Sequence, residues 1–431
     1  MKRLIWNELS ASERRMALAR PRQRSDESLQ AAVFGIVDEV RRGGWQGLVD
    51  AAVRIDGEAP RAVEVQPLAA AARRRLPTDR IDALEFAAAR ISAFHEASLP
   101  CDFAMETAPG LTVSKTWRPI ERVGIYVPGG RTTLFSSLMM LAIPARAAGV
   151  REIVTVTPPR PDGGLDELIA LAGELSGIER IWTVGGAQAI AALAFGAGEL
   201  VAVDKICGPG NAWVAEAKRL VSGLPGGPAI DMPAGPSELM VIADADADPR
   251  LVAADLLSQA EHDPAAQVLL VTSSAKLANL VQAEVYTRLS NLPRRAIAAA
   301  SLRSARFIEV GNLDDAVEVA NLYAPEHLAL AVAEPEAMIP NIRHAGSVFA
   351  GPLAAETFGD YLAGSSHVLP TDGAARAWSG VSVYTFLKAM SVQTVTSEAA
   401  RRIAAPAALL ARMEGLEAHA LAADARLEKA G

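Results

Sequence analysis

Cysteine is scarce in this chain of 431 residues, which contains only Cys101 and Cys207. Two cysteines exclude a disulfide scaffold and a cysteine-rich zinc site. Long apolar runs are absent as well, since a run such as residues 138–142 is far too short to cross a bilayer. The N-terminus, Met-Lys-Arg-Leu-Ile-Trp-Asn-Glu-Leu, lacks the apolar core of a secretory signal. These absences predict a cytoplasmic protein without a membrane partner.

A net positive charge is also absent. The formal net charge is −8 at pH 7, which opposes binding to a polyanion. Basic clusters at residues 73–75 and 294–295 have no interleaved aromatic residues, so we interpret both as solvated helix faces. We therefore expect no nucleic-acid partner. Half of the residues are hydrophobic and 21% are charged, which is typical of a globular protein, and the chain length predicts several domains.

Predicted strands and helices alternate from about residue 120 onward. In a first series, strands are predicted at residues 122–127, 153–156, 181–184 and 203–207, with helices from about residues 134, 187 and 212. In a second series, strands are predicted at residues 239–243, 268–271, 307–310 and 328–332, with helices near residues 250–260, 275–289, 313–322 and 336–342. Such alternation predicts parallel sheets built from right-handed crossover units.

The two series predict an α/β fold with two Rossmann-like lobes. Residues 121–235 are expected to form one contiguous lobe. Residues 1–120, which are mainly helical in pattern up to about residue 110, are expected to join residues 236–380 in the other lobe. Residues 381–431 form an Ala-rich tail that we predict to be helical, and it is too long to be a simple terminus.

A Gly-x-Gly-x-x-Gly fingerprint, which often marks a dinucleotide site, is missing. Three other glycine-containing junctions follow predicted strands, at residues 128–130, 185–188 and 208–211. Glycine permits close approach of a ligand, and the N-terminus of the following helix attracts phosphate or carboxylate. Any one junction is equally well explained as a tight turn without a ligand. Three junctions at one sheet edge favour a cleft, because ligands of open α/β sheets bind at the carboxyl ends of strands.

Two pairs of polar residues are candidates for chemistry. Asp248 as N-cap and Pro249 in the first turn predict that the helix near residues 250–260 spans about residues 249–262. Gln259 and His262 lie three residues apart in this helix, so their side chains share one face. Such a pair is by itself a weak sign of a metal site. Glu326 and His327 are adjacent at the start of a predicted strand, where regular geometry would point them to opposite faces. Both can serve one substrate only if the start of the strand is irregular, and the alternative is a solvated glutamate beside a capping histidine.

Residues 230–262 contain Ile-Asp-Met-Pro-Ala-Gly-Pro-Ser-Glu-Leu and end in Leu-Leu-Ser-Gln-Ala-Glu-His. This run resembles the histidinol dehydrogenase family, and the resemblance covers nearly the whole chain. It implies an aldehyde-dehydrogenase-like architecture and an NAD- and zinc-dependent oxidation of L-histidinol through L-histidinal to L-histidine. Two departures border the expected site and bear on substrate affinity. Ser365 and Ser366 replace the more usual Thr-Asn before His367, and Asp263 replaces a common glycine.

The resemblance also implies roles for individual residues. His327 would accept the hydroxyl proton, and Glu326 would activate the water that hydrates the aldehyde. The implied zinc ligands are Gln259, His262, Asp360 and His419. The implied NAD contacts are Tyr126, Gln188 and Asn211, of which Asn211 is also a candidate helix cap. The implied substrate contacts are Ser237, Gln259, His262, His327, Asp360, Glu414 and His419.

The tail carries two of these residues, Glu414 and His419. They are five residues apart, about 140° around one continuous helix, although Gly415 between them can break that geometry. The tail also has an apolar stripe, formed by Leu409, Leu410, Met413 and Leu416. Its burial on a second copy predicts a two-fold homodimer. The resemblance implies that each tail completes the active site of the partner.

Two alternatives to histidinol oxidation remain open at the level of sequence. One is a related dehydrogenase of another small alcohol, such as a sulfonated propanediol. Ser237 and Glu238 disfavour it, because those relatives vary in this region. The other is a zinc-dependent hydrolase, in which a metal and the Glu326–His327 pair would activate water. The glycine junctions disfavour a hydrolase, because it has no need of a dinucleotide site.

Overall fold

The computed structural model describes residues 1–20, 27–129, 133–233 and 235–430. Gly130 of the first glycine junction and Ala234 of the Ala-Gly-Pro-Ser-Glu run lie outside the described residues. The chain divides into two compact units. The larger unit comprises Met1–Ala97 and Glu121–Phe386, and the smaller comprises Ser98–Ile120 and Leu387–Gly431. Among the described helices, none combines the length and the apolar character that a bilayer span requires.

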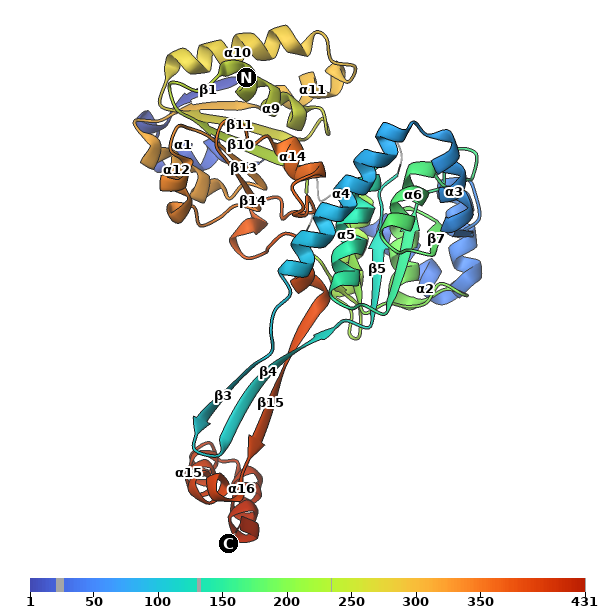
Figure 1. Ribbon diagram of the computed structural model, residues 1–431, viewed down its shortest axis with the longest axis vertical. Helices are drawn as coiled ribbons and strands as arrows, with labels where there is room; N and C mark the ends of the chain where they lie inside the picture. The colour runs from blue at the N-terminus through green and yellow to red at the C-terminus, as the bar shows by residue number, and fades with distance from the viewer. Residues whose placement is uncertain (21–26, 130–132, 234, 431) are drawn as a thin grey trace. The chain divides into compact units, whose positions relative to one another are not determined.

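One six-stranded parallel sheet of the larger unit, here called sheet A, has the order β1-β12-β11-β10-β13-β14 (Figure 1). Its strands are β1 (Lys2–Ile5), β12 (Arg306–Glu309), β11 (Gln267–Thr272), β10 (Glu238–Ala243), β13 (His327–Ala331) and β14 (Ser347–Ala350). Its helices are α1 (Ala11–Ala17), α9 (Pro249–Ala260), α10 (Ala275–Leu289), α11 (Arg295–Leu302), α12 (Leu313–Tyr323), α13 (Pro335–Met338) and α14 (Glu356–Tyr361).

The central strand β10 of sheet A is buried on both faces, as expected for a parallel sheet covered by helices. Leu239 and Val241 pack into a core with α9, α10 and α11. Met240 and Ile242 point the other way, into a core with α1 and α12. Helix α9 starts where the sequence indicates, with Asp248 as N-cap and Pro249 in the first turn.

The second sheet of the larger unit, here called sheet B, has the order β2-β7-β6-β5-β8-β9 and is parallel except for β2. Its strands are β2 (Ala62–Glu64), β7 (Arg180–Thr183), β6 (Glu152–Thr157), β5 (Arg122–Tyr126), β8 (Lys205–Cys207) and β9 (Ala229–Ile230). Its helices are α2 (Glu27–Asp56), α3 (Val65–Arg75), α4 (Thr78–Ala97), α5 (Phe135–Ala147), α6 (Glu167–Leu175), α7 (Gly186–Phe195) and α8 (Ala212–Ser222). The predicted α/β class with two Rossmann-like lobes is confirmed.

The N-terminal helices differ from the prediction that residues 1–120 belong with residues 236–380. Only β1 and α1 join sheet A. Residues 27–97 cover sheet B instead, since β2 pairs with β7 and α2 packs on α7 and α8. Val33 and Val37 of α2 share a core with Trp182 of β7. Helical periodicity reveals that α2 has an apolar face, but it does not reveal which sheet that face covers.

The smaller unit differs from the helical tail that the sequence predicts. It contains an antiparallel sheet of the order β15-β4-β3, with β3 (Phe103–Ala108), β4 (Leu111–Pro119) and β15 (Leu387–Val395). Helices α15 (Ser397–Met413) and α16 (Glu417–Ala430) follow and pack on each other. Residues 98–120 were expected to be mainly helical up to about residue 110, and residues 381–431 to be helical throughout. Strand β15 is exposed along nearly its entire length, so its sequence lacks the one-sided apolar pattern that identifies a strand.

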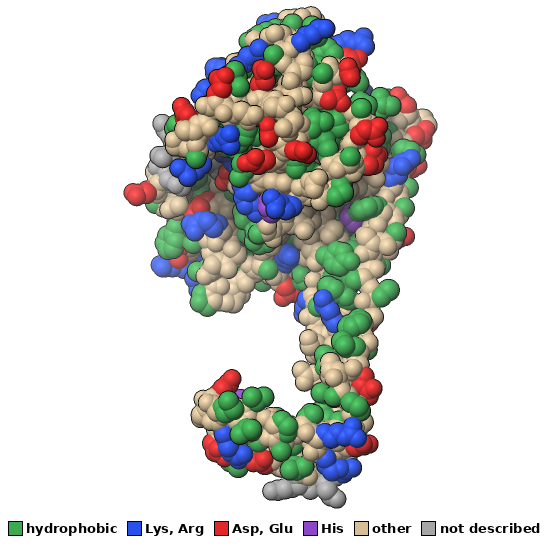
Figure 2. Space-filling view, turned by 90° about the vertical axis from the view of Figure 1, so that its left-hand side faces the viewer, with side chains coloured by type: hydrophobic (Ala, Val, Ile, Leu, Met, Phe, Trp, Pro, Cys, Tyr) green, Lys and Arg blue, Asp and Glu red, His purple; other side chains and the backbone are tan. Residues whose placement is uncertain are grey.

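Apolar side chains remain uncovered on the helices of the smaller unit (Figure 2). The exposed fractions of Leu409, Leu410 and Met413 are 60%, 62% and 74%. The apolar stripe predicted for the tail is therefore present on the surface of this unit. Short 3-10 helices complete the chain, at η1 (Trp6–Glu8), η2 (Ile339–Asn341), η3 (Ala374–Arg376) and η4 (Val383–Phe386).

Candidate functional site

A cavity of about 170 Å³ in the larger unit is lined by residues of both lobes. From the lobe of sheet B come the start of α5 and the turn after β8, including Gly208 and Gly210. From the lobe of sheet A come residues at the starts of β10 and β13, the end of α9 and helix α14. The lining residues from this side that the sequence predicts are Ser237, His262, Glu326, His327 and Asp360. The cavity therefore gathers residues that lie far apart in the chain.

The parallel pairing of β10 with β13 places Glu326 and His327 beside Glu238. The main-chain N–H of Glu238 donates a hydrogen bond of 2.8 Å to Oε2 of Glu326. The main-chain carbonyl of Glu238 is 3.0 Å from Nδ1 of His327. Both side chains thus face the same point of the neighbouring strand. Glu326 lies before the first residue of β13, and Ala324, which ends α12, has a left-handed φ of 56°.

The hydrogen bond to Glu238 determines the tautomer of His327. A carbonyl oxygen can only accept a hydrogen bond, so Nδ1 of His327 carries the hydrogen and donates the hydrogen bond. Nε2 therefore carries the lone pair. Nε2 has no hydrogen-bond partner within the described part of the chain. Burial lowers the pKa of His327 to about 3, which keeps the ring neutral at physiological pH. His327 is therefore set up to accept a proton at Nε2.

Burial shifts the pKa values of the neighbouring carboxyl groups, Glu326 and Asp360, upward, in the direction opposite to that of His327. Burial raises the pKa of Glu326 well above its ordinary value, although the hydrogen bond from the main chain of Glu238 opposes this shift, and the Glu238 and Asp360 carboxylates raise the pKa further. Burial also raises the pKa of Asp360 to about 6, although His262 opposes this shift. A carboxylate with a raised pKa is a stronger base than an exposed one. The site thus combines a neutral imidazole with carboxylates of increased basicity.

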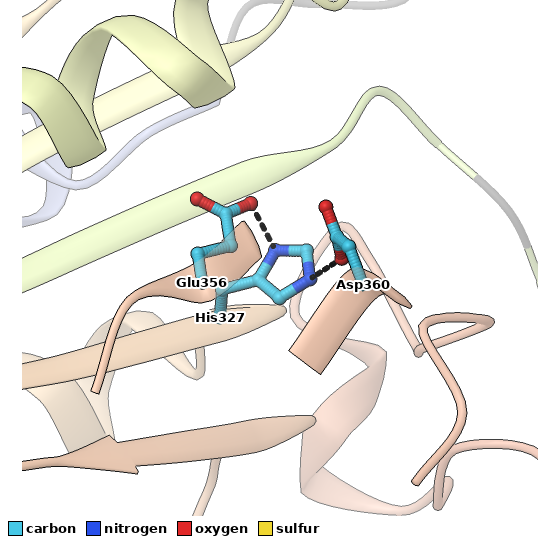
Figure 3. Close-up of side chains that lie close together, drawn as sticks. All are labelled: His327, Glu356 and Asp360. Atoms are coloured by element: carbon cyan, nitrogen blue, oxygen red, sulfur yellow. Dashed lines mark ion pairs between the residues drawn. The ribbon is translucent and has the colours of Figure 1, made fainter. Parts of the chain in front are cut away.

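Helix α14 presents two carboxylates to His327, as Figure 3 shows. Glu356 Oε1 lies 3.4 Å from Nδ1 of the imidazole, and Asp360 Oδ1 lies 4.0 Å from Nε2. The potential ligand atoms of these three residues all lie within 4.8 Å of one another. Glu356 was not among the site residues predicted from the sequence. Its position four residues before Asp360, on the same face of a short helix, was the signal available.

Gln259 and His262 lie at the end of α9, next to this cluster. Gln259 is fully buried, and neither its amide oxygen nor its nitrogen has a hydrogen-bond partner among the residues described. Such an orphaned amide is costly unless a ligand satisfies it. His262 lines the cavity together with Asp360. Burial lowers the pKa of His262, although Asp360 opposes this shift, and the lower pKa favours the neutral imidazole that a metal binds.

Two of the predicted NAD contacts surround the turn between β7 and α7. The hydroxyl of Tyr126 accepts a hydrogen bond of 3.3 Å from the N–H of Gly186. The side-chain amide of Gln188 donates to Asp56 over 3.0 Å, and Asp56 also accepts from the N–H of Gly185. The amide oxygen of Gln188 is buried and has no partner in the described ranges. The N-terminal end of α7 therefore faces the carboxylate of Asp56, at the position where an anionic ligand could otherwise bind.

The third predicted NAD contact, Asn211, caps helix α8. Its side-chain oxygen accepts from the N–H groups of Trp213 and Val214, so the predicted capping role is confirmed. Gly208 before it has a φ of 125°, and a Cβ there would lie 2.1 Å from the carbonyl oxygen of Tyr126. Gly208 is thus required by the approach of β5, whether or not a ligand binds.

A buried ion pair holds the Gly208 turn against the strand that follows. Asp231 accepts a hydrogen bond of 2.7 Å from the N–H of Gly208. Lys218 pairs with Asp231 and donates to the carbonyl of Gly208 over 2.9 Å. Both charged side chains are almost completely buried. Asp231 itself lines the cavity, so this pair shapes one of its walls.

The residues predicted in the tail belong to the smaller unit. Glu414 is the C-cap of α15, and His419 lies in the first turn of α16. Gly415 between the two helices has a φ of 76°, which breaks the continuous helix as the sequence allows. The departures from the family pattern have local partners. Ser366 accepts from the N–H of Val368, and Asp263 accepts from the N–H of Ala265.

Comparison with known proteins gives a family match over residues 18–427, to the model of histidinol dehydrogenase. The chain belongs to the histidinol dehydrogenase family. The histidinol dehydrogenase of Xylella fastidiosa is 47% identical over the full length of both chains, and that of Legionella pneumophila is 43% identical over 99% of this chain and 98% of the relative. The resemblance inferred from residues 230–262 is thereby confirmed.

Two solved structures resemble the fold of this chain. Histidinol dehydrogenase from Elizabethkingia anophelis has a TM-score of 0.95 at 38% identity, covering 100% of this chain and 98% of that one. An acetylating aldehyde dehydrogenase from Geobacillus thermoglucosidasius has a TM-score of 0.50 at 14% identity, over 87% of this chain and 99% of that one. The second likeness concerns the fold alone, and it confirms the expected aldehyde-dehydrogenase-like architecture.

The Lys218–Asp231 pair generates a prediction about stability in this member of the histidinol dehydrogenase family. We expect Lys218→Met to lower the free energy of unfolding by about 3–5 kcal/mol, because it leaves a buried carboxylate without its partner. Urea denaturation measures the change. Arg219→Met is a matched control at the next position, where an exposed arginine pairs with Glu216. We expect that change to cost less than about 1 kcal/mol. Equal losses for both variants would contradict the role of the buried pair.

Proposed function

We propose that the chain oxidises L-histidinol through L-histidinal to L-histidine, the last step of histidine biosynthesis, and reduces NAD in both half-reactions. Membership of the histidinol dehydrogenase family supports this proposal. The observation that carries it is the pair Glu326 and His327, both held by the main chain of Glu238 at one cavity. The family also supports a cytoplasmic location.

In the first half-reaction, His327 acts as the base. Its Nε2 lone pair accepts the hydroxyl proton while the carbinol carbon loses a hydride, which leaves the aldehyde. Nδ1 remains bonded to the carbonyl of Glu238, so the ring keeps its orientation as it becomes charged. The nearby Asp360 carboxylate stabilises the imidazolium that forms.

In the second half-reaction, Glu326 acts as the base. Its carboxylate accepts a proton from the water that adds to the aldehyde carbon, and the resulting anionic adduct then loses the second hydride, which leaves the carboxylic acid. Burial raises the pKa of Glu326, which strengthens it as a base. The N–H of Glu238 anchors one carboxylate oxygen, so the other is available to the water. The two adjacent residues thus divide the two proton transfers between them.

We assign the zinc ligands of the larger unit to Gln259, His262 and Asp360. The orphaned amide of Gln259 fits a metal, because an amide oxygen is a suitable neutral ligand. His327 is left out of the ligand set, because its Nε2 must stay free to accept a proton. When bound, zinc supplies a Lewis acid that holds the imidazole and amino nitrogens of the substrate. Ser237 lines the same cavity and is assigned to the substrate.

We assign NAD binding to Tyr126, Gln188 and Asn211. The buried amide oxygen of Gln188 is free to accept a hydrogen bond from the cofactor, which supports this assignment. Asp56 faces the start of α7 and would repel a phosphate there. The pyrophosphate is therefore expected away from this helix, toward the turn of Gly208 and Gly210 that lines the cavity.

We further propose a homodimer in which His419 and Glu414 of one chain complete the site of the other. The exposed stripe of Leu409, Leu410 and Met413 supports it, because so much uncovered apolar surface is typical of an interface. His419 would be the fourth zinc ligand, and Glu414 would contact the substrate.

The proposed reaction predicts that the purified chain forms about two molecules of NADH from each L-histidinol, because the oxidation removes four electrons. Absorbance of NADH measures the yield, and chelation of the metal should abolish it until Zn²⁺ is restored. NADH formed from a sulfonated propanediol and not from L-histidinol would support the related dehydrogenase instead. An active preparation that contains no metal would contradict the zinc assignment.

The division of labour between His327 and Glu326 predicts separate kinetic effects. We expect His327→Asn to slow the oxidation of L-histidinol by about 10²–10⁴-fold, the usual loss for a general base. We expect Glu326→Gln to slow mainly the conversion of L-histidinal, by a similar factor. Rates with the two substrates, measured separately, test the assignment. Wild-type rates of both variants with both substrates would rule it out.

The shared site predicts complementation between inactive chains. His419→Ala and His262→Ala remove ligands proposed to come from different subunits, so each homodimer should be inactive. Mixing the two variants should restore part of the activity, because one of the two sites in a mixed dimer keeps every ligand. Subunit exchange must be verified in the same sample, for example by mass spectrometry. Failure to complement despite exchange, or full activity of a monomer, would exclude the shared site.

A further inference from the structure

The carboxylate of Glu238 is bound by Arg20, a residue outside the proposed catalytic set. The guanidinium contacts both carboxylate oxygens of Glu238, with Nη2 at 2.8 Å from Oε2 and Nε pairing with Oε1. The N–H of Asp372 also donates to Oε1, over 3.2 Å. The exposed fraction of the Glu238 side chain is 2%, so this carboxylate depends on these donors for its charge to be compensated.

Arg20 makes a second set of contacts, to the segment that leads into β13. Nη2 donates to the main-chain carbonyls of Tyr323 and Ala324, over 3.0 Å and 3.3 Å. The guanidinium also lies over the ring of Tyr323, 3.9 Å from its centre. Ala324 is the residue with the left-handed backbone, two positions before Glu326. One planar group therefore joins the start of β10 to the segment that leads from α12 into β13.

These contacts connect Arg20 to both proposed bases without touching either. Glu238 orients Glu326 through its N–H and His327 through its carbonyl. Ala324 precedes the pair in the segment that joins α12 to β13. A shift of either segment would change both hydrogen bonds together. Misplacement of a catalytic group by about 1 Å can cost about 10²-fold in rate.

We propose that Arg20 is a positioning residue for the reaction, which fixes the segments that carry Glu238 and the Glu326–His327 pair in register. The inference rests on the proposed oxidation of L-histidinol. It has a kinetic signature different from that of either base. Because Arg20 acts on the main chain that holds both bases, its loss slows the alcohol and the aldehyde half-reactions by similar factors. Loss of one base slows mainly one half-reaction.

The test is the variant Arg20→Ala in the full-length chain, assayed separately with L-histidinol and L-histidinal. We expect kcat to fall about 10²-fold with both substrates, while KM for each substrate and for NAD changes less than about threefold. Added guanidinium chloride, at concentrations below those that unfold the chain, should raise the kcat of the Arg20→Ala variant at least about tenfold. The same concentration of tetramethylammonium chloride should not, because it lacks the planar donors that match a carboxylate.

Arg376→Ala is the matched control. Arg376 also donates to carbonyls at the end of α12, those of Asn321 and Leu322, but has no contact with Glu238. We expect its kcat to stay within about threefold of wild type. If Arg20→Ala does not fold, Glu238→Gln replaces it, since the amide keeps the size of the side chain and loses one acceptor for the guanidinium. The same parallel loss in both half-reactions is expected.

Each result decides between the proposals. Activity of the folded Arg20→Ala chain near that of wild type would overturn the positioning role and leave the proposed function intact. Loss confined to one half-reaction, or an equal loss in Arg376→Ala, would overturn it as well. A wild-type chain that forms no NADH from L-histidinol would overturn the proposed function, and the positioning role with it.

Discussion

The parallel register between β10 and β13 is the constraint on which the candidate site depends. It places the main chain of Glu238 beside Glu326 and His327, where one N–H and one carbonyl meet two different side chains. On the β10 side both hydrogen bonds use backbone groups, so they depend on the register of the two strands. Ala324, with its left-handed backbone, ends helix α12 just before these two residues.

Burial gives these groups chemical states that exposed side chains would not have. The same desolvation lowers the pKa of His327 and raises those of Glu326 and Asp360, because in each case it disfavours the charged form. These shifts favour a neutral imidazole at His327, and they make the carboxylates of Glu326 and Asp360 stronger bases when they are ionised. The orphaned amide of Gln259 is unfavourable in the free protein for the same reason, and a bound metal would relieve it.

The glycine junctions show why a pattern of residue types needs a structure to be interpreted. Gly208 is required by the close approach of the Tyr126 carbonyl, and the first turn of α7 faces Asp56 rather than open solvent. Both are explained by contacts within the protein. The junction at Gly208 still lines the cavity, held there by the Lys218–Asp231 pair. A ligand site and a structural turn are therefore not exclusive alternatives at this position.

Sequence alone determined the α/β class, the two lobes, the start of α9 at Asp248, the cap at Asn211 and, through the motif at residues 230–262, the family. These features depend on local periodicity, capping and contiguous residues, which the chain order preserves. The tertiary structure decided that α2 covers sheet B, that β15 pairs with β4 and that Glu356 and Arg20 lie near the candidate bases. Each of these contacts joins residues distant in the chain or depends on which faces meet. Periodicity identifies an apolar or polar face, but only packing selects its partner.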